Sequence, residues 1–117
     1  SGLWLIFIPG DGLAYGGAWA ISDDGATAVR GATLEVGFAA ERVFLVLGSR
    51  GGRPREVAVR LDGRPLPDAL AGSDVRGGQA TIRGQRLYRL VDLDKPGEHR
   101  LTLELGPGVS GYAFTFG

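Results

Sequence analysis

The sequence predicts an all-β fold, an antiparallel two-sheet sandwich. Turn residues separate short apolar or alternating runs, because 21 glycines and six prolines are spread along the 117 residues. Two runs, 55–62 and 99–105, alternate between apolar and polar side chains, which is typical of strands with one face on a core and one in water. The best helical segment, 68–71, ends at Gly72 and follows two prolines, so it has room for one turn at most.

The content of β-branched and aromatic residues predicts ten strands. Asp62-Gly63, Asp94-Lys95-Pro96-Gly97 and Gly106-Pro107-Gly108 carry suitable turn chemistry. The run RVFLVLG at 42–48 is apolar on both faces, which predicts a central strand covered on both sides. The expected strands are Leu3–Ile8, Ala18–Ser22, Ala26–Arg30, Ala32–Phe38, Arg42–Gly48, Arg55–Asp62, Gln79–Arg83, Leu87–Asp92, His99–Leu105 and Gly111–Phe116.

Composition indicates one domain over residues 1–117, with 1–16 as an extra N-terminal strand and loop. Thirteen basic residues balance 13 acidic ones, which argues against a broad nucleic-acid surface. The longest apolar run, LWLIFI at 3–8, is much shorter than the roughly 20 residues of a membrane-spanning helix. The absence of cysteine excludes a disulfide, a thiol nucleophile and a cysteine-based metal site within the sequence.

The sequence offers little for catalysis, and we expect a protein that is not an enzyme and uses no cofactor. The one histidine, His99, lies at a strand start, where an exposed or edge-capping role is expected. No serine lies in a Gly-x-Ser-x-Gly elbow. A hydrolase using aspartates is the remaining catalytic hypothesis, and it requires two carboxylates in one cleft with at least one raised pKa. Asp92 and Asp94 flank Leu93 and are candidate calcium ligands, with turn capping as the alternative.

The glycine-rich segment 48–53, GSRGGR, superficially suggests a phosphate cradle. It lacks the Gly-Lys-Ser/Thr ending of that motif, and no helix is expected after it. We therefore interpret it as a hairpin loop.

Aromatic side chains provide the best binding hypothesis, because sugars and flat ligands dock on exposed rings while polar groups at the margin orient them. The alternatives are core packing for the rings and surface ion pairing for the polar residues. The candidate platforms are Trp4, Tyr88 and Tyr112, and the candidate hydrogen-bonding margins are Arg60, Asp62 and Arg89.

The N-terminal apolar run also suggests an interface. An exposed apolar strand at a sheet edge tends to find a partner, so this segment could support a homo-oligomer or a swapped strand. The candidate interface residues are Leu3, Trp4, Ile6 and Phe7.

Several segments together resemble the C-terminal domain of DipZ-type thiol–disulfide transfer proteins. The resemblance spans about residues 17–117 and is carried by Gly17-Ala18-Trp19, RVFLVLG at 42–48, RLYRLV at 86–91, PGEHRLTL at 96–103 and the closing YAFTFG at 112–117. In that family, a membrane-embedded electron-transfer portion is joined to an extracytoplasmic thioredoxin-like domain and then to a small sandwich resembling carbohydrate-binding modules. The Cys-x-x-Cys of the thioredoxin-like portion is absent here, so its redox chemistry is not carried over.

The resemblance implies a jelly-roll, galactose-binding-like sandwich in the periplasm or cell envelope. We expect a non-catalytic accessory module whose partner is a cell-envelope glycan or a thioredoxin-like redox domain. The alternative is a structural or oligomerisation domain that uses the Leu3–Ile8 strand.

Overall fold

The computed structural model describes the backbone of residues 13–21 and 26–117, and the side chains of residues 33–109 and 117. All described strand pairs are antiparallel, which confirms the predicted all-β fold. No described helix is long and apolar enough to cross a membrane. The segment 68–71 forms the expected single turn, η2 (Asp68–Leu70). The other elements are β1 (Leu13–Ile21), β2 (Ala26–Ser49), η1 (Arg50–Gly52), β3 (Arg55–Leu61), β4 (Arg64–Pro65), β5 (Val75–Arg76), β6 (Gln79–Ile82), β7 (Arg86–Leu105) and β8 (Val109–Phe116).

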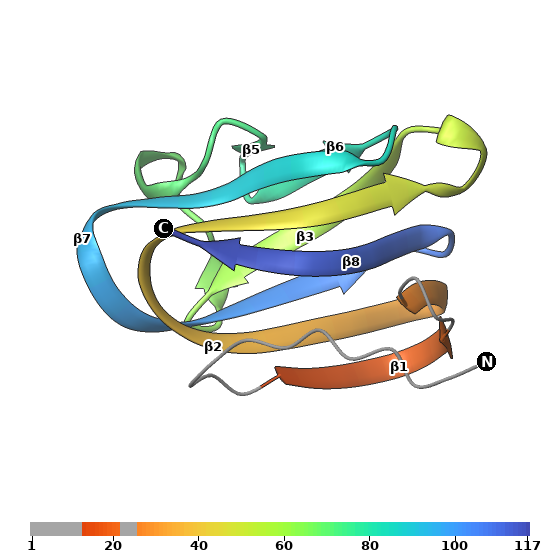
Figure 1. Ribbon diagram of the computed structural model, residues 1–117, viewed down its shortest axis with the longest axis horizontal. Coiled ribbons are helices and arrows are strands. Elements are labelled where there is room, and N and C mark those ends of the chain that lie inside the picture. Colours follow the sequence, from red (N-terminus) through yellow and green to blue (C-terminus); the bar gives the residue numbers. More distant parts are fainter. Residues whose placement is uncertain (1–12, 22–25) are drawn as a thin grey trace.

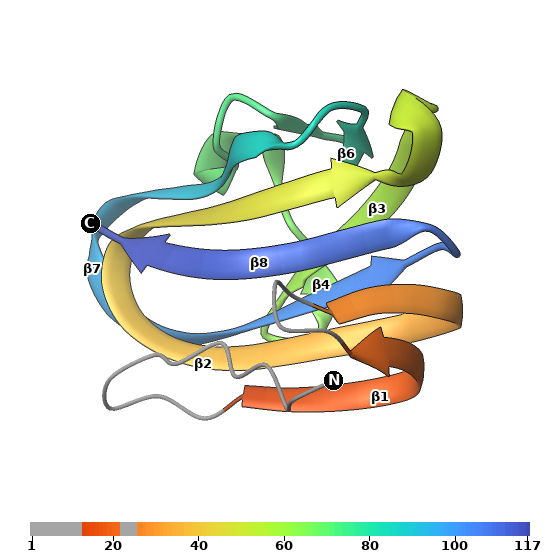
Figure 2. The same cartoon turned by 45° about the vertical axis from the view of Figure 1, so that its right-hand side comes forward.

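Two long strands, β2 and β7, pair with each other and bend together from one layer of the sandwich into the other (Figure 1). Residues 32–40 of β2 pair with 97–105 of β7, in the layer that β1 and β3 extend. Residues 42–47 of β2 pair with 86–92 of β7, and β8 lies along this part of β2. Figure 2 shows the resulting fold-over with the molecule turned by 45° from the view of Figure 1.

The bend corrects two expectations. Segments 26–30, 32–38 and 42–48 are one strand, and the expected turn at 94–97 lies within β7. Only Glu41 separates the paired residues Ala40 and Arg42 of β2, whereas residues 93–96 separate their partners on β7. The extra residues give β7 the longer path around the bend, where it lies outside β2 in Figure 1. Pairing resumes beyond these shifts, so both strands stay continuous.

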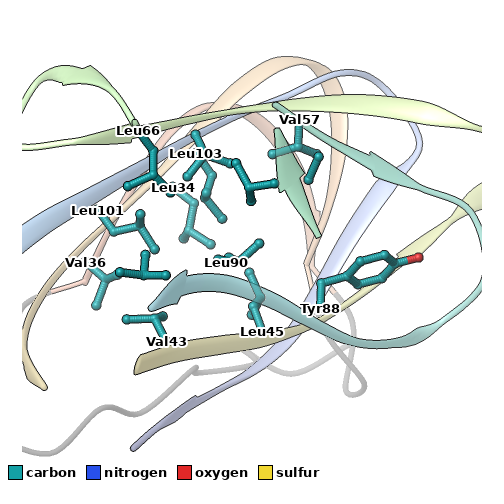
Figure 3. Close-up of a cluster of buried hydrophobic side chains, with 14 of the residues drawn as sticks. Leu34, Val36, Val43, Leu45, Val57, Leu66, Tyr88, Leu90, Leu101 and Leu103 are labelled. Atoms are coloured by element: carbon teal, nitrogen blue, oxygen red, sulfur yellow. The ribbon is translucent and has the colours of Figure 1, made fainter. Parts of the chain in front are cut away.

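One apolar core fills the space between the layers (Figure 3). Leu34 pairs with Leu103 and Val36 with Leu101 in one layer, while Leu45 pairs with Tyr88 in the other. All these side chains are buried. From residue 33 onward, the buried apolar side chains of β2 are even-numbered up to Ala40 and odd-numbered from Val43 to Leu47, because the shift at Glu41 exchanges the faces of the strand.

The strand 42–48 is central, as expected, since it lies between β7 and β8. Its covering differs from the expectation. Val43, Leu45 and Leu47 are fully buried, but Phe44 and Val46 on the outer face are only partly buried. This incompletely covered outer face forms the floor of the candidate site.

Candidate functional site

A groove of about 360 Å³ lies on the outer face of the layer formed by the second half of β2 and the first half of β7. Side chains alternate across a strand, so the residues beside the core positions point to this face. Pairing places Phe44 opposite Arg89 and Arg42 opposite Asp92. The lining residues are Arg42, Phe44, Gly72, Ser73, Leu87, Arg89, Val91 and Asp92.

The groove combines an apolar floor with a polar margin. Leu87 is 42% exposed, the large apolar side chain most open to solvent among those described, and the half-buried Phe44 ring lies on the neighbouring strand. At the margin, Arg42 Nε lies 3.3 Å from Asp92 Oδ1, and Arg89 and Ser73 are exposed. Such a surface can contact a ring on its flat face while donating and accepting hydrogen bonds at the ring's edge.

One wall of the groove is the segment 71–74, which runs beside β7. Ala71 forms a β-bridge with Val91, the Gly72 amide donates to the Leu90 carbonyl at 3.0 Å, and the Asp74 amide donates to the Arg89 carbonyl at 3.2 Å. A Cβ at position 72 would lie 2.3 Å from the Arg89 carbonyl oxygen. Glycine is therefore required for this wall to approach the strand so closely.

Asp74 fastens the same wall through its carboxylate. Its Oδ2 accepts the Arg89 amide at 2.7 Å, and its two oxygens accept the Arg86 guanidinium nitrogens at 2.8 and 3.2 Å. The hydrogen bonds from Arg86 are the main reason that the pKa of Asp74 is lowered from its ordinary value of 3.8. The Arg86 guanidinium in turn lies 3.8 Å from the centre of the Tyr88 ring.

The charge of Asp74 should give a measurable pH dependence. Because its folded pKa is below the unfolded value, its stabilising effect is complete above the unfolded pKa and is lost as pH falls through the folded pKa. Asp74→Asn retains an acceptor for the Arg89 amide and removes the charge. We expect it to lower the free energy of unfolding by about 1 kcal/mol at pH 7. Urea unfolding at several pH values should show this difference shrinking below about pH 4. A difference that is constant from pH 7 to pH 2 would contradict this role.

Tyr88 is a correction to the predicted binding residues. Its side chain is 1% exposed, so the ring belongs to the core and cannot act as a platform (Figure 3). Its hydroxyl donates to the Gly84 carbonyl at 2.7 Å and accepts the Arg83 amide at 3.1 Å. The signal was available in the sequence, because Tyr88 shares its strand face with Leu90, whereas Leu87 and Arg89 occupy the other face.

The predicted margin residues are separated in the structure. Arg89 lies in the groove, whereas Arg60 and Asp62 lie on and just after β3, in the other layer. Arg60 Nε contacts Glu104 Oε1 at 2.7 Å. Asp62 Oδ2 lies 2.6 Å from His99 Nδ1, and Oδ1 accepts the Arg100 amide at 2.9 Å.

These contacts give Asp62 and His99 structural roles. The hydrogen bond from His99 is the main reason that the pKa of Asp62 is lowered from 3.8, and the Arg100 amide adds to the effect. His99 lies within β7 and not at a strand start as expected, and its ring contacts Asp62 in the turn after β3.

The remaining candidates are not brought together in the described part of the chain. Leu3, Trp4, Ile6 and Phe7 lie outside the described residues, and so does the side chain of Tyr112. Asp92 pairs with Arg42, and no group of three or more His, Cys, Asp or Glu residues suited to a metal ion includes it or Asp94 within the described ranges. The described carboxylates with shifted pKa values, Asp62 and Asp74, are shifted downward, the opposite of what the hydrolase hypothesis requires.

Sequence reasoning missed Phe44, Leu87, Arg42 and Ser73 as site residues. Phe44 lies in a run of apolar residues, which predicts a strand buried on both faces, so the exposure of its ring was not expected. Ser73 lies in a loop whose position beside β7 depends on long-range pairing, so the local sequence held no comparable signal.

Comparisons with known proteins agree with this architecture. The model of a family described as the thioredoxin-like C-terminal domain matches residues 8–117. No curated protein matches the chain significantly.

Solved structures of family two carbohydrate esterases share the fold. One from Clostridium thermocellum in complex with cellohexaose superposes with a TM-score of 0.69 and 25% identity, over 91% of this chain and 31% of the esterase chain. An active-site mutant of that esterase gives a TM-score of 0.67 at 26% identity, over 91% of this chain and 31% of the mutant chain. The Cellvibrio japonicus enzyme gives a TM-score of 0.68 at 20% identity, over 89% of this chain and 30% of that chain. At this identity the similarity supports the fold alone. This chain thus spans about a third of the length of each esterase.

Proposed function

This chain belongs to the thioredoxin-like C-terminal domain family, and we propose that it is a non-catalytic accessory module that binds glycans through the groove at Phe44 and Leu87. The observation that carries the proposal is the apolar floor bordered by guanidinium, carboxylate and hydroxyl groups. The similarity to an esterase whose structure was solved in complex with cellohexaose supports a carbohydrate as the class of ligand.

The chemistry of the groove matches that of a sugar ring. The C–H groups on the face of a pyranose can pack on Phe44 and Leu87, while its hydroxyls can exchange hydrogen bonds with Arg89, Ser73 and the Arg42–Asp92 pair. The hydrogen bonds of Gly72 and Asp74 fix the wall that carries Ser73 against β7 without a ligand, which lowers the entropy lost on binding.

A calorimetric titration of the intact chain with cellohexaose tests this proposal. We expect binding to weaken about tenfold in Phe44→Ala, because the variant loses the ring against which the sugar would pack, and a tenfold change corresponds to about 1.4 kcal/mol. Arg60→Gln is the matched control, since Arg60 was also a candidate but lies in the other layer.

Three results would overturn the proposal. The first is the absence of binding to a broad panel of neutral oligosaccharides. The second is weaker cellohexaose binding in Arg60→Gln but unchanged binding in Phe44→Ala. The third is the appearance of shorter sugars after prolonged incubation of cellohexaose with the protein. The last of these would contradict the non-catalytic role.

The same proposal places the module in an extracytoplasmic protein of DipZ type, beside a thioredoxin-like domain. Its support is the sequence resemblance and the family match over residues 8–117. If the thioredoxin-like domain is a separate protein, we expect it to bind the module weakly when purified. Otherwise we expect the two domains to lie in one polypeptide. Detection of the parent protein only in the cytoplasmic fraction of its source cell would contradict this placement.

A further inference from the structure

Four arginines gather at the end of the sandwich opposite the bend of β2 and β7. We call this group, Arg50, Arg53, Arg55 and Arg83, the arginine end. Three turns meet there, on the right-hand side of Figure 1: η1 after β2, the turn between β6 and β7, and the turn between β7 and β8. The Ser49 amide donates to the Arg83 carbonyl at 3.2 Å, and the Arg50 amide donates to the Gly108 carbonyl at 2.9 Å.

Arg55 holds this end together. Its Nε donates to Ser49 Oγ at 2.8 Å, its Nη1 to the Pro107 carbonyl at 2.6 Å, and its Nη2 to the Arg50 carbonyl at 3.4 Å. The Gly108 turn accommodates the guanidinium closely, since a Cβ at Gly108 would lie 2.6 Å from Arg55 Cζ. Arg55 is therefore a fixed support, and the exposed members of the group are Arg50, Arg53 and Arg83.

Four arginines without ion-pair partners among the described residues lie together at this end, whereas Arg64, Arg76 and Lys95, which also lack such partners, lie elsewhere. Within the described residues, no carboxylate lies in ion-pair contact with any of the four arginines, whereas Arg42, Arg60, Arg86 and Arg100 each have such a partner. The chain as a whole carries no net charge. A local excess of positive charge on a neutral protein attracts an anionic ligand to that one surface.

The residues of the three turns favour one class of ligand. Guanidinium groups bind carboxylates through paired hydrogen bonds, and three of them spread over two turns can contact repeated charges along a chain. The η1 turn carries Gly51 and Gly52 in left-handed conformation, with open space around both. Leu87, the exposed large apolar residue of the described chain, lies on the groove instead, so the described residues of this end include no apolar anchor of a membrane-binding surface.

We propose that the arginine end is a second binding site, for a polysaccharide that bears carboxylate groups. The proposal rests on the proposed function only in that the ligand is a glycan. The residues, the charge of the ligand and the location on the fold all differ from those of the groove.

The test uses oligogalacturonate, a chain of carboxylate-bearing sugars, titrated into the intact protein at low and high salt. We expect binding that weakens with added salt and falls at least about tenfold in the triple variant Arg50→Gln, Arg53→Gln, Arg83→Gln. The matched control is Arg64→Gln, Arg76→Gln, Lys95→Gln, which removes the same charge from exposed positions elsewhere and should bind within about threefold of wild type.

Comparator ligands and a groove variant separate this site from the proposed function. Phe44→Ala should retain oligogalacturonate binding while losing cellohexaose, and the arginine triple variant should show the reverse. The proposal is overturned if the wild type does not bind oligogalacturonate, if both triple variants lose binding equally, or if Phe44→Ala abolishes it. Stronger binding to polyglutamate or to phosphatidylglycerol vesicles would also overturn it, in favour of an acidic protein or a membrane.

Discussion

Gly72→Ala is expected to lower the free energy of unfolding by about 3 kcal/mol, near the upper end of the usual effect of overpacking. The added methyl would lie 2.3 Å from the Arg89 carbonyl oxygen and 2.5 Å from the carbonyl carbon. Both are backbone atoms of a paired strand, so they cannot move aside as a flexible side chain would. The wall must retreat, which weakens the hydrogen bonds from Gly72 to Leu90 and from Asp74 to Arg89.

Gly84→Ala is the matched control for this prediction. A Cβ there meets no atom within 4 Å, and the residue is not in the left-handed region. Its unfolding free energy should lie within about 0.5 kcal/mol of wild type, as at most exposed positions. Equilibrium urea unfolding of the three proteins gives the comparison. Equal stability of the two alanine variants would show that the wall does not pack against β7 as described.

Leu103→Ala should have a comparable or larger effect, a loss of about 2–5 kcal/mol. Leu103 is fully buried and pairs with two strands at once, with Leu34 of β2 and Val59 of β3. Truncation leaves a cavity between the two layers, beneath a strand whose backbone is fixed by pairing on both sides, so the site has little freedom to collapse. The measurement is again urea unfolding, with the slope checked for two-state behaviour.

Leu87→Ala is the control, because it makes the same leucine-to-alanine truncation in the groove floor instead of the core. Because Leu87 is 42% exposed, this change should reduce stability by less than about 1 kcal/mol. It should weaken cellohexaose binding, whereas a folded Leu103→Ala protein should still bind. If Leu87→Ala unfolds as readily as Leu103→Ala, the groove floor is part of the core and not an open surface.

The groove depends on an irregularity in strand pairing. Val43 pairs with Val91 and Phe44 with Arg89, so Leu90 is an extra residue on β7. Leu90 and Val91 are consecutive and both buried, which strict alternation does not allow. A bulge at this point re-aims the side chains around it, and it is here that Arg89, Val91 and Asp92 gather on one surface.

The sequence by itself determined the features that depend on neighbouring residues. Alternation predicted the buried face of β3, with Val57, Val59 and Leu61 inward. The Asp62-Gly63 pair predicted the turn after β3, where both residues have positive φ angles, 53° and 84°. Two prolines and Gly72 limited 68–71 to one helical turn. These preferences arise from backbone sterics and from one strand's own pleat, so they are visible locally.

Only the tertiary structure decided what depends on distant partners. Nothing near residues 39–42 or 92–97 shows that β2 and β7 continue through a bend, because each strand is held there by the other. Burial of Tyr88 and partial exposure of Phe44 depend on which segments cover each face, and the loop at Gly72 reaches β7 only through long-range hydrogen bonds. Pairing register and the covering of faces are properties of the assembled chain, so the groove could not be located before the fold was known.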